Sequence, residues 1–232
     1  MPLTSSQIVS LACTAAKCPG FTSQGGQFLN QVLEELVLER DLKVNRKTQF
    51  ITVQANNNGP FSLETDYLRT YDLFFSQNNL PYFLDPVSME EYDMEFKDPS
   101  IANYPYEFAT DLSVEAQTAS NAAGQLYIYP QSSGAIVLTH RYMVQRPDIV
   151  APETANVVPW FAYQLYLIKR TAMWLMTLTD DSRQPEFMQE TENMLRPYLI
   201  MEGDEQKVVK QIKLDPRKFH VTRYLKPTKV TG

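Results

Sequence analysis

The sequence lacks the features that mark a membrane or exported protein. It contains no run of about eighteen consecutive apolar residues, the minimum for a membrane-spanning helix. Its first residues, MPLTSSQIVSLACTAAKCPG, lack the basic stretch and following apolar run of a signal peptide. We therefore expect no membrane segment, and a soluble protein made in a cytosol.

Cysteine and histidine are also scarce, with two of each: Cys13, Cys18, His140 and His220. The cysteines are five positions apart in a predicted helix, so they do not face each other and a bridge would strain the helix. Both fit small buried apolar side chains. Metal sites need more ligands close together, so we expect no metal site.

The chain has no motif of a common enzyme class. It contains no G-x-G-x-x-G, no G-x-x-x-x-G-K-[ST], no G-x-S-x-G and no H-E-x-x-H. His140 lies in a predicted strand and fits an exposed or hydrogen-bonded histidine better than a base. Glu90-Glu91 fit the first turn of a helix, and Asp180-Asp181 fit a helix N-cap. We expect no catalytic site.

Charge is divided unevenly along the chain, whose net charge is −6. Residues 1–206 hold 13 Lys and Arg against 26 Asp and Glu, a net of −13. Residues 207–232 hold eight basic residues against Asp215 alone, a net of +7. Such a division predicts a basic arm that seeks an acidic surface or a nucleic-acid backbone.

Helical periodicity occurs at both ends of the acidic part. The predicted helices cover residues 5–17, 23–42, a stretch from Pro159 to a break at 180–182, and residues from 184 or 185 to 195. Ser5 or Ser6 would cap the first helix, and Pro197 would end the last. On the second helix, four charged residues would face water: Glu34, Glu35, Glu39 and Arg40.

The intervening hundred residues have the two-residue alternation of strands. Residues 48–54 and 106–110 predict strands, and 73–76 with 80–84 predict a hairpin whose Pro81 arm lies at an edge. Residues 125–130 and 135–144 predict a second strand pair. Ser88 begins a capping box for a short helix over 88–96, and 113–124 predicts a mobile loop.

These patterns predict an α+β protein. Neither helical pair offers a core alone, but four packed helices do. We predict a four-helix domain from residues 1–45 and 150–205, an inserted antiparallel β-domain at 46–149, and an extended basic C-terminal arm at 206–232. Fourteen aromatic residues fall between Tyr67 and Tyr142 in the insertion, and we expect half or more of them in its core.

Six short segments of the sequence resemble those of a known family. They are Asp66–Arg69, Leu80–Asp93, Tyr104–Asp111, Leu126–Gly134, Arg141–Ile149 and Val158–Phe161, reading DYLR, LPYFLDPVSMEEYD, YPYEFATD, LYIYPQSSG, RYMVQRPDI and VPWF. In this order, over about residues 60–165, the chain resembles the head-to-tail adaptor (connector) proteins of short-tailed bacteriophages.

The resemblance implies a virion structural protein without catalytic site or cofactor. Such adaptors form a ring, typically of twelve copies, beneath the portal, and the helical domain would be the ring-forming part. Double-stranded DNA passes through the lumen during ejection, without sequence-specific binding. A C-terminal extension clasps the portal protein, and the opposite face receives the tail or nozzle proteins. The expected location is the neck of the virion, after assembly in the host cytoplasm.

Within the basic arm, seven residues are the predicted portal contacts, because arginine and aromatic side chains anchor interfaces. They are Arg217, Lys218, Phe219, His220, Arg223, Tyr224 and Lys226. Two alternatives stay open. The aromatic β-domain could bind a carbohydrate or a receptor, or the basic arm could bind nucleic acid directly.

Overall fold

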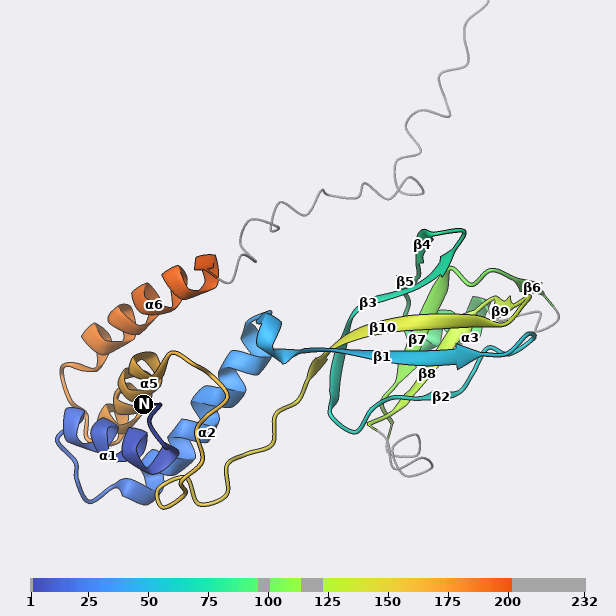
Figure 1. Cartoon of the computed structure of the whole chain (residues 1–232). Coiled ribbons are helices and arrows are strands. Elements are labelled where there is room, and N and C mark those ends of the chain that lie inside the picture. The colour runs from blue at the N-terminus through green and yellow to red at the C-terminus, as the bar shows by residue number, and fades with distance from the viewer. Residues whose placement is uncertain (1, 96–100, 114–122, 202–232) are drawn as a thin grey trace, which may run out of the picture.

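Two lobes, each with its own hydrophobic core, form the part of the chain that the computed structural model describes, residues 2–95, 101–113 and 123–201. One core gathers side chains from residues 8–42 and 161–195, and the other from residues 51–144. The lobes lie at opposite ends of an elongated molecule (Figure 1). The chain is α+β, as predicted.

The helical lobe contains four helices around its core. They are α1 (Ser5–Ala15), α2 (Thr22–Glu39), α5 (Gln164–Leu178) and α6 (Gln184–Met201). Helix α5 contacts the other three, and α1 also contacts α2. This central position explains why α5 carries apolar residues on most of its circumference, since eight of its fifteen residues are buried.

A glycine sets the close approach of α1 and α2. A Cβ atom on Gly25 would lie 3.0 Å from Val9 Cγ1 and 3.2 Å from Cys13 Sγ, so the space exists only without a side chain. Cys13 and Cys18 are both free and buried, as expected. Cys18 lies beyond the end of α1, where its N–H donates to the carbonyl of Cys13 at 2.9 Å.

Helix α1 begins at Ser5 as predicted, but its predicted cap and the predicted start of α5 were wrong. Thr4, rather than Ser5 or Ser6, caps α1, because Gln7 completes a capping box: its N–H donates to Thr4 Oγ1 at 3.4 Å, and its Oε1 accepts from the Thr4 N–H at 3.0 Å. Helix α5 begins at Gln164 and not at Pro159. The residues between them are not helical, and they include the buried Phe161.

The predicted end of the last helix was also wrong. Pro197 lies inside α6, which continues to Met201. Tyr198 follows it and packs on the core, with its ring centroid 4.9 Å from Phe161 and 5.9 Å from Tyr163. Aromatic packing therefore holds the last turn in place, although proline removes one helix hydrogen bond.

The β-lobe is built from two four-stranded sheets and a short pair. The first sheet has the order β1 (Arg46–Val53), β10 (Ile136–Val144), β3 (Tyr67–Gln77), β4 (Leu80–Phe83). The second has the order β2 (Phe61–Ser62), β8 (Gln125–Tyr129), β7 (Glu107–Asp111), β5 (Asp85–Pro86). The pair is β6 (Ala102–Asn103) with β9 (Gln131–Ser132). Pairing is antiparallel except for β5–β7 and β6–β9, which corrects the purely antiparallel prediction.

The predicted hairpin and the predicted capping box of the β-lobe are both confirmed. The β3–β4 hairpin turns at Asn78 and Asn79, both with positive φ, and β4 with Pro81 is an edge strand. Helix α3 (Met89–Glu95) begins with the predicted capping box, in which the Glu91 N–H donates to Ser88 Oγ at 3.1 Å. Residues 114–122 of the predicted loop lie outside the described residues.

The lobes are joined by two chain passages that lie side by side. A 3-10 turn (Lys43–Asn45) leads from α2 into β1, and the chain returns after β10. Arg46 pairs with Met143, so the insertion opens and closes at the same place. The domain limits 1–45 with 150–205, 46–149 and 206–232 stay a prediction. Among the described helices, none combines the length and apolarity needed to cross a membrane.

Candidate functional site: interaction surfaces of the two lobes

The seven predicted portal contacts lie outside the described residues, together with the rest of the basic arm. They are Arg217, Lys218, Phe219, His220, Arg223, Tyr224 and Lys226. Their role stays a prediction. The candidate surfaces of the described chain are an aromatic face on the β-lobe and a groove between the lobes.

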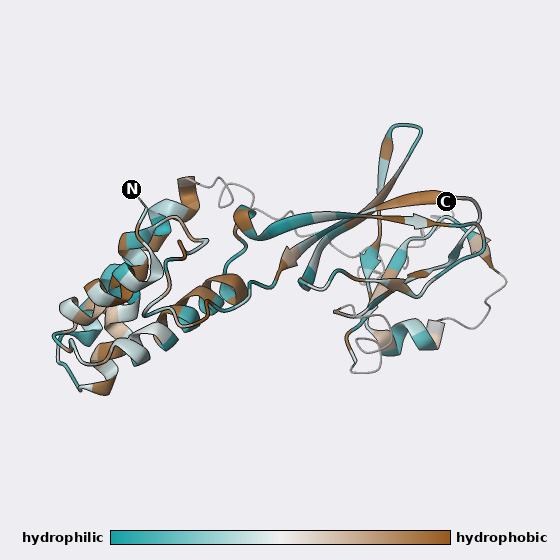
Figure 2. Ribbon diagram, turned by 60° about the horizontal axis from the view of Figure 1, so that its bottom comes forward, coloured by the Kyte–Doolittle hydropathy of each residue, from teal (hydrophilic) through white to brown (hydrophobic). Residues whose placement is uncertain are grey.

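The aromatic face is the outer side of the β1–β10–β3–β4 sheet. Ile51 and Val53 alternate inward from β1, which turns Phe50 outward with 70 % of its surface exposed. Phe50 pairs with Thr139, Thr139 with Phe74, and Phe74 with Phe83, so the side chains form a row across four strands. The β3–β4 hairpin stands out from the lobe (Figure 2).

Ring contacts organise this row. The centroids of Phe74 and Phe83 are 5.2 Å apart, and the Arg141 guanidinium lies 5.1 Å from the Phe74 centroid. Arg141 also pairs with Asp72 at 3.9 Å. An exposed aromatic row with an arginine has the composition that anchors protein interfaces.

A groove of about 570 Å³ runs beside the aromatic face. Its lining includes Phe50, Ser76, Gln77, Tyr104 and Val137. The Gln77 amide donates to the Tyr104 hydroxyl, so the groove presents both ring surface and polar groups. Such a lining can receive a side chain of another protein or a sugar ring.

The expectation that half or more of the aromatic insertion residues are core was too high. Of the thirteen described ones between Tyr67 and Tyr142, five are buried: Tyr67, Phe75, Tyr92, Phe108 and Tyr142. Three more are half-buried and five are exposed. A surplus of exposed rings on a folded domain points to contact with another molecule.

His140 and Asp181, two candidate catalytic groups, are both held in hydrogen bonds within the fold. His140 is fully buried, with Nε2 3.0 Å from Thr70 Oγ1 and Nδ1 3.4 Å from Gln49 Oε1, and burial lowers its pKa to about 4. It is thus a hydrogen-bonded strand histidine, one of the two expected states. Asp181 accepts hydrogen bonds from Arg183, which lower its pKa to about 2.

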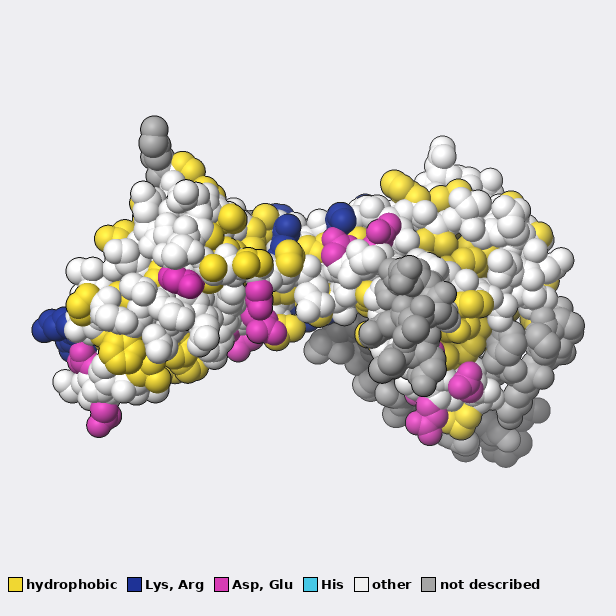
Figure 3. Space-filling model, turned by 90° about the horizontal axis from the view of Figure 1, so that it is seen from below, with side chains coloured by type: hydrophobic (Ala, Val, Ile, Leu, Met, Phe, Trp, Pro, Cys, Tyr) yellow, Lys and Arg dark blue, Asp and Glu magenta, His cyan; other side chains and the backbone are white. Residues whose placement is uncertain are grey.

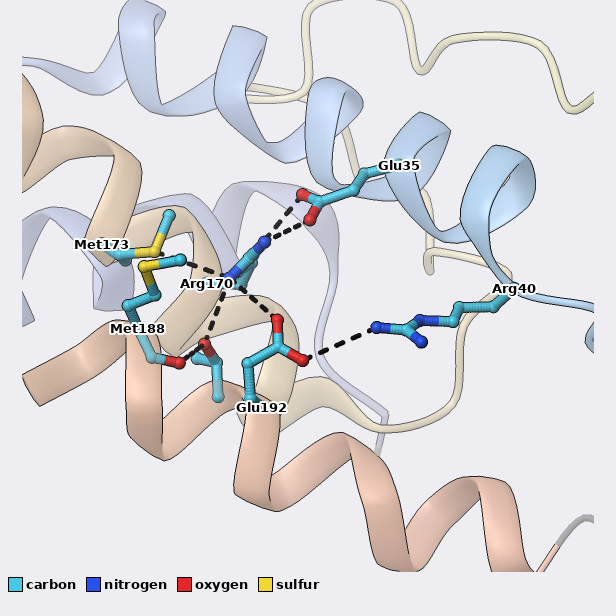
Figure 4. A network of polar contacts seen from close by, with 7 residues as sticks. Glu35, Arg40, Arg170, Met173, Met188 and Glu192 are labelled. Carbon is cyan, nitrogen blue, oxygen red and sulfur yellow. Dashed lines mark hydrogen bonds and ion pairs between the residues drawn. The ribbon is translucent and has the colours of Figure 1, made fainter. Parts of the chain in front are cut away.

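A polar network in the helical lobe joins three helices (Figure 4). Arg170 on α5 donates to Glu35 on α2 and lies 3.5 Å from Glu192 on α6. Glu192 also pairs with Arg40 at 3.6 Å. Burial opposes the charge of Arg170, but the hydrogen bonds to Glu35 outweigh it and raise the arginine pKa.

The network corrects the prediction that Glu35 faces water. Its side chain is 18 % exposed, because α5 lies against that side of α2. Arg170 and Glu35 are 135 positions apart, so no local pattern could have paired them. The signal available in the sequence was a lone arginine within an otherwise apolar helical stripe.

The junction groove, about 510 Å³, lies between the lobes. Its walls are α2, the segment that leads into β3, and the chain that returns after β10. Its lining residues are Asn30, Leu33, Glu34, Val37, Leu38, Thr65, Asp66, Leu68, Gln145, Arg146, Pro147, Asp148 and Trp160. Acidic, basic and hydrophobic side chains lie beside one another at the waist of the molecule (Figure 3).

Two of the charged groups in the junction groove are already engaged. The Arg146 guanidinium donates to Asn45 Oδ1 at 3.2 Å and to the Val44 carbonyl at 2.6 Å. Asp66 accepts from Lys47 at 2.8 Å and from the Tyr142 hydroxyl at 2.9 Å. Burial alone would raise the pKa of Asp66, but these hydrogen bonds lower it.

Within residues 2–95, 101–113 and 123–201, no group of three or more His, Cys, Asp or Glu side chains is placed to hold a metal ion. The sequence model of a family described as "SU10 adaptor protein" matches residues 4–209. No curated protein matches the chain. The match covers both lobes and ends before residues 217–226 of the basic arm.

Proposed function

Because the chain belongs to the SU10 adaptor protein family, we propose that it joins the portal of a bacteriophage head to the tail as a ring of identical subunits. The resemblance to phage head-to-tail adaptors is confirmed by the family match, so the chain is a structural adaptor of a phage particle. The match over residues 4–209 is the observation that carries this proposal.

In the proposed ring, twelve helical lobes stand side by side. Apolar residues outside the helical core support this arrangement, since a neighbouring copy would cover them. They are Leu11, Leu165, Leu178 and Met188, each between 44 and 52 % exposed. No catalytic step is part of this function.

The lumen of the proposed ring passes double-stranded DNA during ejection. Residues 1–206 have a net charge of −13, and a surface without cationic phosphate contacts lets DNA slide without sequence-specific binding. DNA affinity with a steep salt dependence, lost on removing residues 207–232, would instead favour a nucleic-acid-binding protein.

The ring would be held at its two ends by different surfaces. The basic arm would clasp the portal protein through the seven residues of its predicted contact centre: Arg217, Lys218, Phe219, His220, Arg223, Tyr224 and Lys226. The aromatic face of the β-lobe would contact tail or nozzle proteins, because the β-lobe lies at the opposite end of the elongated molecule from the helical lobe. The protein would then act at the virion neck, after assembly in the host cytoplasm.

Purified protein mixed with the portal of its phage tests this proposal. Negative-stain imaging and native mass spectrometry should show rings of about twelve copies on the portal. The variant Arg217→Glu/Arg223→Glu should weaken the complex, whereas Lys207→Glu/Lys210→Glu, with the same charge change outside the contact centre, should not. Absence of a ring would contradict the proposed function, and equal behaviour of the two variants would contradict the proposed role of the arm.

The groove beside the aromatic face supports one second candidate, a carbohydrate- or receptor-binding β-module. Phe50 and Tyr104 offer ring surface there, and Gln77 offers an amide. A glycan array probed with the full chain should then show binding that Phe50→Ala removes. If the array shows no binding, the carbohydrate-binding function is rejected and the adaptor role remains.

A further inference from the structure

The junction groove carries negative charge that the described residues do not neutralise. Glu34 and Asp148 line it, both are exposed, and neither forms an ion pair among those residues. Arg146 also lines the groove and keeps its charge, because its partners Asn45 and Val44 are neutral, and Lys47 pairs with Asp66. The groove thus retains two unpaired carboxylates, Glu34 and Asp148, against one cation. The groove therefore favours a positively charged ligand.

The lining of the groove is also partly apolar. Leu33 and Val37 are buried, and Leu38 remains 54 % exposed. An incoming peptide would supply apolar side chains as well as positive charge, which a small cation would not.

We propose that the junction groove binds residues 207–229 of the same chain before assembly, so that the basic arm is held back until a portal competes for it. The segment carries eight Lys and Arg against Asp215. Apolar residues are interleaved with these charges: Val208, Val209, Ile212, Leu214, Phe219, Val221, Tyr224 and Leu225. Its chemistry thus matches both the acidic groups and the apolar lining of the groove.

The position of α6 favours docking within one chain. The helix ends at Met201, and its lobe also supplies the α2 wall of the groove. A chain of about 25 residues can extend over roughly 80 Å. Because a short tether gives an effective concentration in the millimolar range, weak contacts suffice to hold the segment.

Only the release of the segment by the portal rests on the proposed function. The docking itself is therefore tested on the full chain without portal protein. Zero-length carboxyl–amine cross-linking of a dilute mixture of isotopically light and heavy protein should join lysines of the segment to Glu34 and Asp148 within one chain. Cross-links between light and heavy chains, to other carboxylates, or to none would overturn it.

Trypsin provides a second measurement, because it cleaves after Lys and Arg. The variant Glu34→Gln/Asp148→Asn should raise cleavage within residues 207–229 about five-fold, since each exposed ion pair contributes a factor of about two to five. High salt should remove the difference. Equal cleavage of wild type and variant would overturn the proposal.

A matched control has the same change of charge on the β-lobe. Glu90 and Asp93 are exposed on α3 and do not line the junction groove. Glu90→Gln/Asp93→Asn should leave cleavage of the segment unchanged, and an equal increase would also overturn the proposal. If docking is found but no ring forms on the portal, the proposed function fails and the intramolecular contact stands.

Discussion

Mild acid should destabilise the β-lobe through His140. This side chain is fully buried between the rings of Tyr67 and Tyr142, with centroid distances of 5.6 and 5.3 Å. Its hydrogen bonds to Thr70 and Gln49 suit a neutral imidazole. Burial lowers its pKa from 6.5 to about 4. Between these values the unfolded chain binds a proton that the folded chain does not, so stability falls as pH falls.

The size of the effect follows from the two pKa values. At about pH 5 the proton bound only by the unfolded state lowers the free energy of unfolding by about 2 kcal/mol relative to about pH 7.5. For a lobe of about 100 residues the melting temperature should drop by about 8–16 °C. Asp66 contributes little at about pH 5, because its pKa is lowered and its stabilisation is lost only in stronger acid.

Urea unfolding followed by tyrosine circular dichroism reports mainly on the β-lobe, which holds nine of the thirteen tyrosines, whereas both tryptophans pack on the helical core. The slope of stability against pH should flatten in His140→Gln. His220→Gln removes the other histidine and should keep the wild-type slope. If wild type and His140→Gln lose the same stability on acidification, the assignment to His140 is refuted.

Three further changes test the helical lobe and the aromatic face. Arg170→Leu should lower the free energy of unfolding by about 3 kcal/mol in urea, because Glu35 is left buried and unpaired, whereas Glu192→Gln should cost less than about 1 kcal/mol. Gly25→Ala should cost about 1–3 kcal/mol in the same assay by crowding α1, and no loss would contradict the close approach. Phe50→Ser should leave urea stability within about 0.5 kcal/mol but weaken pull-down of tail proteins, and unchanged pull-down would remove the aromatic face from that contact.

Much of the local structure was predictable because its signals are local. The hairpin at Asn78-Asn79 and the capping box at Ser88 depend on residues within a few positions, and both were read correctly. Thr4 shows the limit of such reading: the same Thr-x-x-Gln signature was present, but the adjacent serines, Ser5 and Ser6, gave competing candidates.

The rest depended on contacts between distant parts of the chain. Pro197 stays inside a helix because Tyr198 packs on Phe161, and Glu35 is half-buried because Arg170 faces it. Each of these contacts joins residues that are far apart in the sequence, so helix propensity and periodicity could not predict it. The junction groove was beyond prediction for the same reason, since its walls come from three separate segments.

The insertion of the β-lobe between α2 and α5 imposes an order on biosynthesis. The core of the helical lobe needs α5, so α1 and α2 wait while residues 40–178 are translated. At about 5–20 residues per second this takes roughly 7–28 s, during which their apolar faces lack their main partner. The β-lobe, complete at Val144, can fold first on the ribosome. Protease resistance of chains arrested beyond residue 180 should therefore show a protected β-lobe before a protected helical lobe.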